Sequence, residues 1–173
     1  MILKKFFCPR AYVESVEDIN LVCLEKAGKK GIIIDLDNTL VEWKGDISLM
    51  KVEIKDWLAD AKRLGFKICL VSNGFNNRVN EAGTILGLPV VPSAVKPRRR
   101  PFLLAMERIG TDPSNTVVVG DQIFTDVLGG NRVGLYTILV KPISDREFFT
   151  TRLVRKLERM VVSYLERHGF TIF

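Results

Sequence analysis

Two aspartates, Asp35 and Asp37, come directly after a short apolar run at Ile32–Ile34. β-Branched residues in such a run predict a buried parallel strand, and open parallel sheets bind their ligands where the strands end. A carboxylate there can act as a nucleophile, exchange a proton or bind a hard cation. The pair could also do no more than close a turn, because Asn38 and Thr39 follow it.

Three further polar clusters each follow another apolar run. They are Ser72 and Asn73 after residues 66–71, Lys96 after residues 88–91, and Asp121 with Asp126 after residues 116–119. The carboxyl ends of parallel strands meet at one edge of a sheet, so we expect these side chains to lie near Asp35. An explanation by turn closure alone would have to account for all four placements.

Four segments resemble the signature motifs of the haloacid dehalogenase superfamily of phosphatases, in the family's order and with similar spacing. They are DLDNTL at 35–40, SN at 72–73, KP at 96–97 and GDQIFTD at 120–126. The resemblance extends from residue 31 to about residue 140. The stretches VEWKGD and GDQIFTDVLGGNRVGLYTILV resemble the YqeG branch, which is similar to the phosphatidylglycerophosphatases of mitochondria and plastids.

The resemblance implies a role for each motif residue. Asp35 would be the nucleophile that forms an aspartyl-phosphate, and Asp37 would protonate the leaving oxygen and then deprotonate the attacking water. Ser72 and Asn73 would bind the phosphate, although Asn73 could instead only cap the turn. Lys96 would balance the charge of Asp35 and of the transferring phosphoryl group.

A magnesium ion is implied because the nucleophile and the phosphate are both anionic. Mg²⁺ prefers oxygen ligands and keeps several waters. By resemblance its ligands would be Asp35, the main-chain carbonyl of Asp37, and Asp121. Asp126 would hold a ligand or Lys96 in place.

The periodicity predicts alternating strands and helices, which is typical of an α/β, Rossmann-like fold with a parallel sheet of about five strands flanked by helices. Strands are expected at residues 30–36, 66–71, 89–91, 116–119 and 136–140, and helices at 51–64, 76–86, 101–109 and 123–132. A short helix within Val13–Ile19 is expected to cover one side of the sheet. We expect a single domain over residues 1–173.

Only about ten residues, Val41–Met50, separate the acid pair from the next predicted helix. This length leaves no room for a large cap domain, and within the superfamily a missing cap implies an open site. Such a site suits a phosphate that protrudes from a lipid surface, a nucleic acid or a protein. Trp43 in this segment could be a flap over the site, a packing residue or an interface residue.

The composition favours a compact domain without a membrane span. Hydrophobic residues make up 47% of the 173 residues, and no run approaches the roughly 20 apolar residues of a spanning helix. No secretory signal is recognisable. The three cysteines, Cys8, Cys23 and Cys69, show no paired spacing, so we expect neither a disulfide framework nor a zinc site. A cytoplasmic location is expected, with peripheral attachment to the inner face of the membrane as the alternative.

Basic residues give the chain a net charge of +6. Lys96 and Arg98–Arg100 could form a basic rim that attracts a polyanion, or simply a solvated helix start. Residues from about 146 to 168 are expected to form a basic amphipathic helix. It could lie on an anionic membrane, or pack on its own domain or on a second subunit.

These observations favour a Mg²⁺-dependent phosphomonoesterase whose substrate is phosphatidylglycerophosphate. One alternative is a phosphatase for another exposed phosphate, such as a nucleic-acid end or a small metabolite; nucleic acid is not favoured, because no known binding module is recognisable. Another is a non-catalytic binding or assembly protein on the same fold. The oligomeric state is not predicted.

Overall fold

The computed structural model describes residues 2–144, 157, 160–163 and 167. Within them six strands form one parallel sheet in the order β1-β6-β5-β2-β3-β4. The strands are β1 Ala11–Val13, β2 Gly31–Ile34, β3 Lys67–Val71, β4 Val90–Val91, β5 Thr116–Gly120 and β6 Tyr136–Val140. The α-helices within residues 2–144 are α1 Ile2–Phe7, α2 Leu21–Lys26, α3 Val52–Arg63, α4 Asn76–Leu86, α5 Arg99–Ile109 and α6 Leu128–Arg132. A π-helical turn at Ile123–Val127 leads into α6, and 3₁₀ turns lie at Val16–Asp18 and Ile47–Leu49.

Apolar layers cover both faces of the sheet. Successive strand residues point to opposite faces, so Ile32 and Ile34 join a core with Trp57 of α3, whereas Ile33 joins a second core with Phe102 of α5. The three isoleucines are fully buried. Burial on both faces explains why β2 reads as a continuous apolar run rather than an alternating one.

The predicted parallel α/β architecture is confirmed, with six strands where about five were expected. The predicted helix over 76–86 coincides with α4, and Gly87 ends it in the left-handed region at φ +60°. The thiol of Cys69 is buried in the second core.

The helix predicted within Val13–Ile19 is confirmed only in part. Val16–Asp18 forms a single 3₁₀ turn, whereas Ala11–Val13 forms the edge strand β1 beside β6, which was not predicted. The strand is held by long-range hydrogen bonds, such as the one that Arg10 N donates to the Thr137 carbonyl at 2.8 Å. A three-residue element of this kind has too little local periodicity to be recognised.

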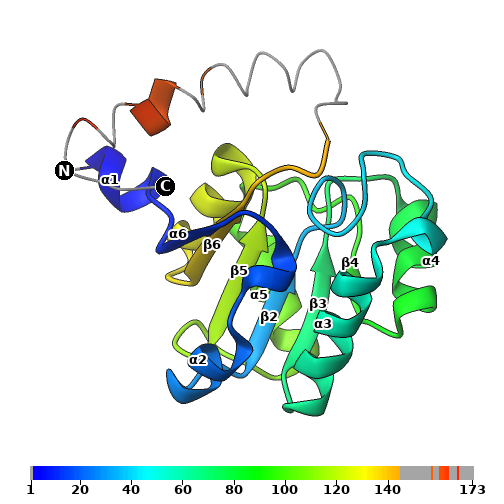
Figure 1. The fold of residues 1–173 in the computed structure, drawn as a ribbon. Coiled ribbons are helices and arrows are strands. Elements are labelled where there is room, and N and C mark those ends of the chain that lie inside the picture. Colours follow the sequence, from blue (N-terminus) through cyan, green and yellow to red (C-terminus); the bar gives the residue numbers. More distant parts are fainter. Residues whose placement is uncertain (1, 145–156, 158–159, 164–166, 168–173) are drawn as a thin grey trace.

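The segment between β2 and α3 contains only the 3₁₀ turn Ile47–Leu49, as expected for a chain without a large cap domain. In Figure 1 this segment crosses above the carboxyl ends of β2 and β3. It therefore borders the edge of the sheet where the predicted site residues lie.

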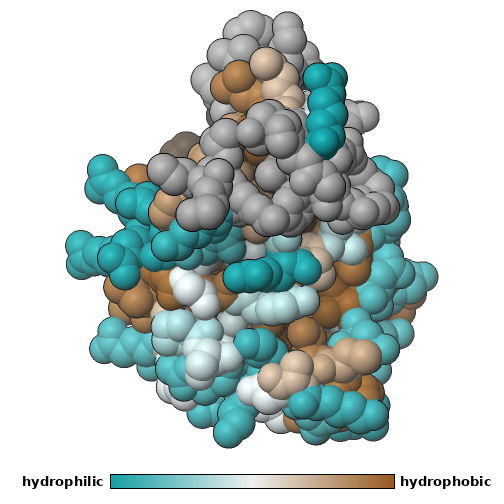
Figure 2. All heavy atoms as spheres, turned by 90° about the vertical axis from the view of Figure 1, so that its left-hand side faces the viewer, coloured by the Kyte–Doolittle hydropathy of each residue, from teal (hydrophilic) through white to brown (hydrophobic). Residues whose placement is uncertain are grey.

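Most of the predicted C-terminal helix, residues 146–168, lies outside the described residues. Leu157, Met160–Ser163 and Arg167 are helical, and Val162 packs against the buried cluster of Ile123, Val127 and Leu139. No helix in the described part of the chain is long and apolar enough to cross a membrane. Figure 2 shows hydrophilic side chains interspersed with hydrophobic ones on the face at the left of Figure 1.

Candidate active site

A sharp bend after β2 directs the first motif into a cavity. Asn38 has a φ of +63°, a left-handed conformation that asparagine tolerates better than most residues, and its N–H donates to the Val41 carbonyl at 2.7 Å. The Asn38 side chain accepts a hydrogen bond from Trp43 N at 3.1 Å. As a result Asp35 and Asp37 line the same cavity, which has a volume of about 300 Å³.

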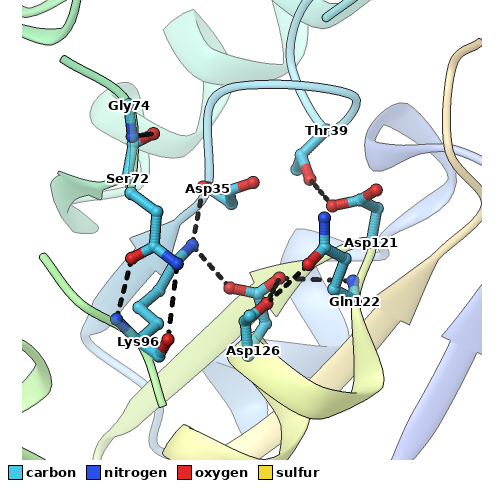
Figure 3. A network of polar contacts seen from close by, with 10 residues as sticks. Asp35, Thr39, Ser72, Gly74, Lys96, Asp121, Gln122 and Asp126 are labelled. Carbon is cyan, nitrogen blue, oxygen red and sulfur yellow. Dashed lines mark hydrogen bonds and ion pairs between the residues drawn. The ribbon is translucent and has the colours of Figure 1, made fainter. Parts of the chain in front are cut away.

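Lys96 lies between two buried carboxylates (Figure 3). Its Nζ is 2.6 Å from Asp35 Oδ1 and 2.6 Å from Asp126 Oδ1. The three residues are 8% or less exposed. They follow the ends of β2, β4 and β5, which are brought together as the motif order predicted. One buried cation is therefore shared by two buried carboxylates, and the three groups together carry a net negative charge when both carboxylates are ionised.

The burial of this cluster alters its protonation. Burial raises the pKa of Asp35 to about 7, and the charges of Asp126 and Asp37 act in the same direction while Lys96 opposes them. Burial alone would lower the pKa of Lys96, but the carboxylates of Asp126 and Asp35 outweigh it and raise that pKa. Lys96 is consequently a permanent cation, and a second cation beside Asp35 would favour the ionised carboxylate.

Asn73 holds the main chain of Lys96. Its Oδ1 accepts from Lys96 N at 2.7 Å, and its Nδ2 donates to the Lys96 carbonyl at 3.3 Å. Ser72, also buried, lines the cavity, and its Oγ accepts from Gly74 N at 3.0 Å. Ser72 therefore lies at the cavity wall, whereas the Asn73 side chain orients the main chain of Lys96.

Three carboxylates could take part in holding a cation. Asp35, Asp121 and Asp126 are buried and offer oxygens within 4.8 Å of one another. Asp126 is already engaged, because its Oδ1 meets Lys96 and its Oδ2 accepts from Gln122 N at 3.2 Å. Asp35 and Asp121 are therefore the better candidates, and Asp126 fits the expected supporting position. The Asp37 side chain is not part of this cluster.

Arg78 is a site residue that the sequence did not reveal. It lines the cavity from the first turn of α4, and its Nη2 lies 3.0 Å from Asp37 Oδ1. A cation is unfavourable near a helix N-terminus unless a partner offsets the dipole. That misplaced charge is the one signal in the sequence that points to Arg78.

Gly120, at the end of β5, is required by the packing of Asp126. A Cβ at this position would lie 2.3 Å from Asp126 Cγ. We expect Gly120→Ala to destabilise the protein by about 1–3 kcal/mol in urea unfolding, because this contact forces the loop to shift. The loss should be less than additive with that of Asp126→Ala, since removing the carboxylate removes the two 2.3 Å contacts and leaves only the contact with the Cβ of residue 126, at 2.6 Å. Full additivity would contradict this explanation.

Comparison with known proteins agrees with this geometry. Residues 41–134 match the model of the haloacid dehalogenase-like hydrolases. Over 168 residues the chain is 41% identical to the "Probable phosphatase YqeG" of Bacillus subtilis, and the match covers 97% of this chain and 96% of that protein. The chain belongs to the haloacid dehalogenase-like hydrolases, and within them it is a phosphatase of the YqeG type.

Two further comparisons are more distant. The chain is 28% identical to the chloroplastic and mitochondrial phosphatidylglycerophosphate phosphatase 1 of Arabidopsis thaliana, and the match covers 96% of this chain but 50% of that protein. The cobalt-bound deoxy-D-mannose-octulosonate 8-phosphate phosphatase of Haemophilus influenzae has a TM-score of 0.54 at 12% identity, over 79% of this chain and 89% of that one. The latter likeness concerns the fold alone.

Proposed function

We propose that this phosphatase is a Mg²⁺-dependent phosphomonoesterase that acts through an aspartyl-phosphate on Asp35. The observation that carries the proposal is the buried Asp35 carboxylate at the cavity wall, 2.6 Å from Lys96 Nζ. A phosphate monoester is a very slow substrate in water, so nucleophile, acid and charge clamp must act together. Asp35, Asp37 and Lys96, whose chemistry suits these three roles, line one cavity.

In the first step an Asp35 oxygen attacks phosphorus, and the bond from phosphorus to the leaving oxygen breaks. Asp37, on the same cavity, gives a proton to that oxygen. In the second step water attacks phosphorus and passes a proton to Asp37, and the bond from Asp35 to phosphorus breaks. Lys96 and Ser72 balance and orient the phosphoryl oxygens throughout.

The donor set fits a hard divalent cation. Asp35 and Asp121 offer buried carboxylate oxygens, and the Asp37 carbonyl is the third candidate ligand. When bound, Mg²⁺ would supply positive charge that lets two anionic groups, the nucleophile and the phosphate, approach each other.

Phosphatidylglycerophosphate is the proposed substrate, and its products are phosphatidylglycerol and inorganic phosphate. The proposal is supported by the likeness to the Arabidopsis phosphatidylglycerophosphate phosphatase, which extends over nearly the whole of this chain. Phe75 lines the cavity yet is 76% exposed, so it offers an apolar contact at the mouth, and the basic residues Lys44 and Arg78 line the same cavity. A phosphate on a lipid head group with acyl chains nearby suits such a mouth.

The test is phosphate release from phosphatidylglycerophosphate in mixed micelles, with and without Mg²⁺. p-Nitrophenyl phosphate, a phosphorylated sugar and a 3′-phosphorylated oligonucleotide run beside it. We expect kcat/KM for the lipid to exceed the others by at least about tenfold, because binding energy outside the phosphate contributes to specificity. Equal turnover of all substrates would contradict the proposal that the lipid is the preferred substrate. Phosphate release that is unchanged by EDTA would contradict the proposed requirement for Mg²⁺.

A further inference from the structure

Arg78 joins three separate segments at the mouth of the cavity. Its Nη2 and Nε lie 3.0 and 3.3 Å from Asp37 Oδ1, at the end of β2. Its Nη1 donates to the Gly45 carbonyl at 2.7 Å, in the segment between β2 and α3. The Arg78 and Asp37 side chains are 23% and 19% exposed, so this pair is partly shielded from water. Such a pair is better ordered than an ordinary surface ion pair.

The two oxygens of Asp37 have different surroundings. Oδ1 accepts from Arg78 and also from Lys44 N, at 3.1 Å. Oδ2 faces the Ser72–Gly74 turn, since a Cβ on Gly74 would lie 3.3 Å from Oδ2 and 3.2 Å from Ser72 Oγ. Oδ1 is thus held in place by N–H donors, whereas Oδ2 is the oxygen on the side of Ser72, where the phosphate would lie.

We propose that Arg78 is the positioning residue for proton transfer: it anchors Asp37 through Oδ1, so that Oδ2 exchanges the proton with the leaving oxygen and then with the attacking water. This inference rests on the proposed function, in which Asp37 is the general acid and base. As the bond between phosphorus and the leaving oxygen breaks, the proton of Oδ2 moves to that oxygen. In the second step Oδ2 takes a proton from the attacking water.

The dependence on the leaving group separates this role from a merely structural one. An alkyl alkoxide is a poor leaving group and needs the proton, whereas p-nitrophenolate leaves without it. One positioned acid contributes about 10²–10⁴-fold. Loss of Arg78 should therefore affect alkyl phosphates far more than p-nitrophenyl phosphate, and loss of structure would affect both alike.

The experiment measures kcat/KM of Arg78→Met, Arg78→Lys and Asp37→Asn on glycerol phosphate and p-nitrophenyl phosphate, with melting temperatures alongside. We expect Arg78→Met to lose about 10²-fold on glycerol phosphate and less than about tenfold on p-nitrophenyl phosphate. Arg78→Lys should show the same asymmetry, since the single ammonium group of lysine cannot donate to Asp37 and to the Gly45 carbonyl in the geometry of the planar guanidinium. Arg63→Met is the control, because Arg63 pairs with Asp60 at 2.9 Å on the exposed face of α3.

The double variant Asp37→Asn, Arg78→Met should be no worse than Asp37→Asn, because both changes remove one function. Equal losses on the two esters in both Arg78 variants would overturn the inference and leave the proposed function standing. A larger loss on glycerol phosphate than on p-nitrophenyl phosphate in Asp37→Asn, but not in the Arg78 variants, would also overturn the inference and leave the proposed function standing. A wild-type protein that hydrolyses neither ester, nor the lipid, would overturn the proposed function and this inference with it.

Discussion

Asp35→Asn is expected to lower phosphate release by at least about 10⁴-fold on every substrate, because loss of the nucleophile closes the covalent route. Asparagine keeps the shape of the side chain, so the cavity and its other groups remain. The measurement is single-turnover phosphate release under Mg²⁺, with mass spectrometry for a phosphorylated chain. A variant that keeps a tenth of the activity would exclude Asp35 as the nucleophile.

The same substitution should not destabilise the metal-free protein at alkaline pH. The pKa of Asp35 is about 7 in the folded chain, well above its ordinary value of 3.8. The folded state thus holds this proton more tightly than the unfolded state, and stability falls as pH rises from about 4 through 7. The Asp35→Asn variant would not share that loss, because its amide does not titrate. The measurement is the melting temperature in EDTA. The difference between the variant and the wild type (variant minus wild type) should be more positive at pH 8 than at pH 5.

Lys96→Met is expected to have the largest effect on stability. It leaves the carboxylates of Asp35 and Asp126 buried without the cation that lies 2.6 Å from each. Removal of one partner from a buried ion pair costs about 3–5 kcal/mol. The loss should be greatest at pH 8 and should shrink toward pH 5, because Asp35, whose pKa is raised to about 7, takes up a proton in this range and part of the uncompensated charge disappears.

Lys141→Met is the matched control for this substitution. Lys141 pairs with Glu14 at 2.8 Å, but both side chains are more than 60% exposed. Such a pair contributes about 0–1 kcal/mol. Urea unfolding of both variants at the two pH values compares a buried with an exposed lysine. Similar losses in the two variants would mean that the cluster around Lys96 is better hydrated than the structure indicates.

The sequence predicted those site residues whose chemistry is tied to the end of a strand. Asp35, Ser72 and Asp121 each follow an apolar run, and the parallel topology then brings them to one edge. Lys96 was predicted only through its order among the motifs, since a lysine before a proline is usually a solvated surface residue. The roles of these residues remain proposals that the kinetic experiments test.

The remaining features depend on contacts that a local pattern does not contain. Arg78 meets Asp37 across 41 residues, and the contact depends on the course of the segment between β2 and α3. Asn73 reaches the main chain of Lys96 across 23 residues, which the sequence left open as phosphate binding or turn capping. The strand β1 exists only because β6, far along the chain, offers it hydrogen-bonding partners.

The lengths of the outermost strands have a consequence for self-association. β1 has three residues and β4 has two, so among the described strands the two outer edges of the sheet are very short. Long, flat edges are the usual templates for misassembly through added strands, and very short ones are a common protection against it. The apolar central strands are thereby kept out of reach of β pairing with another molecule. We therefore expect self-association through the described part of the chain to use helices or loops rather than an extended sheet.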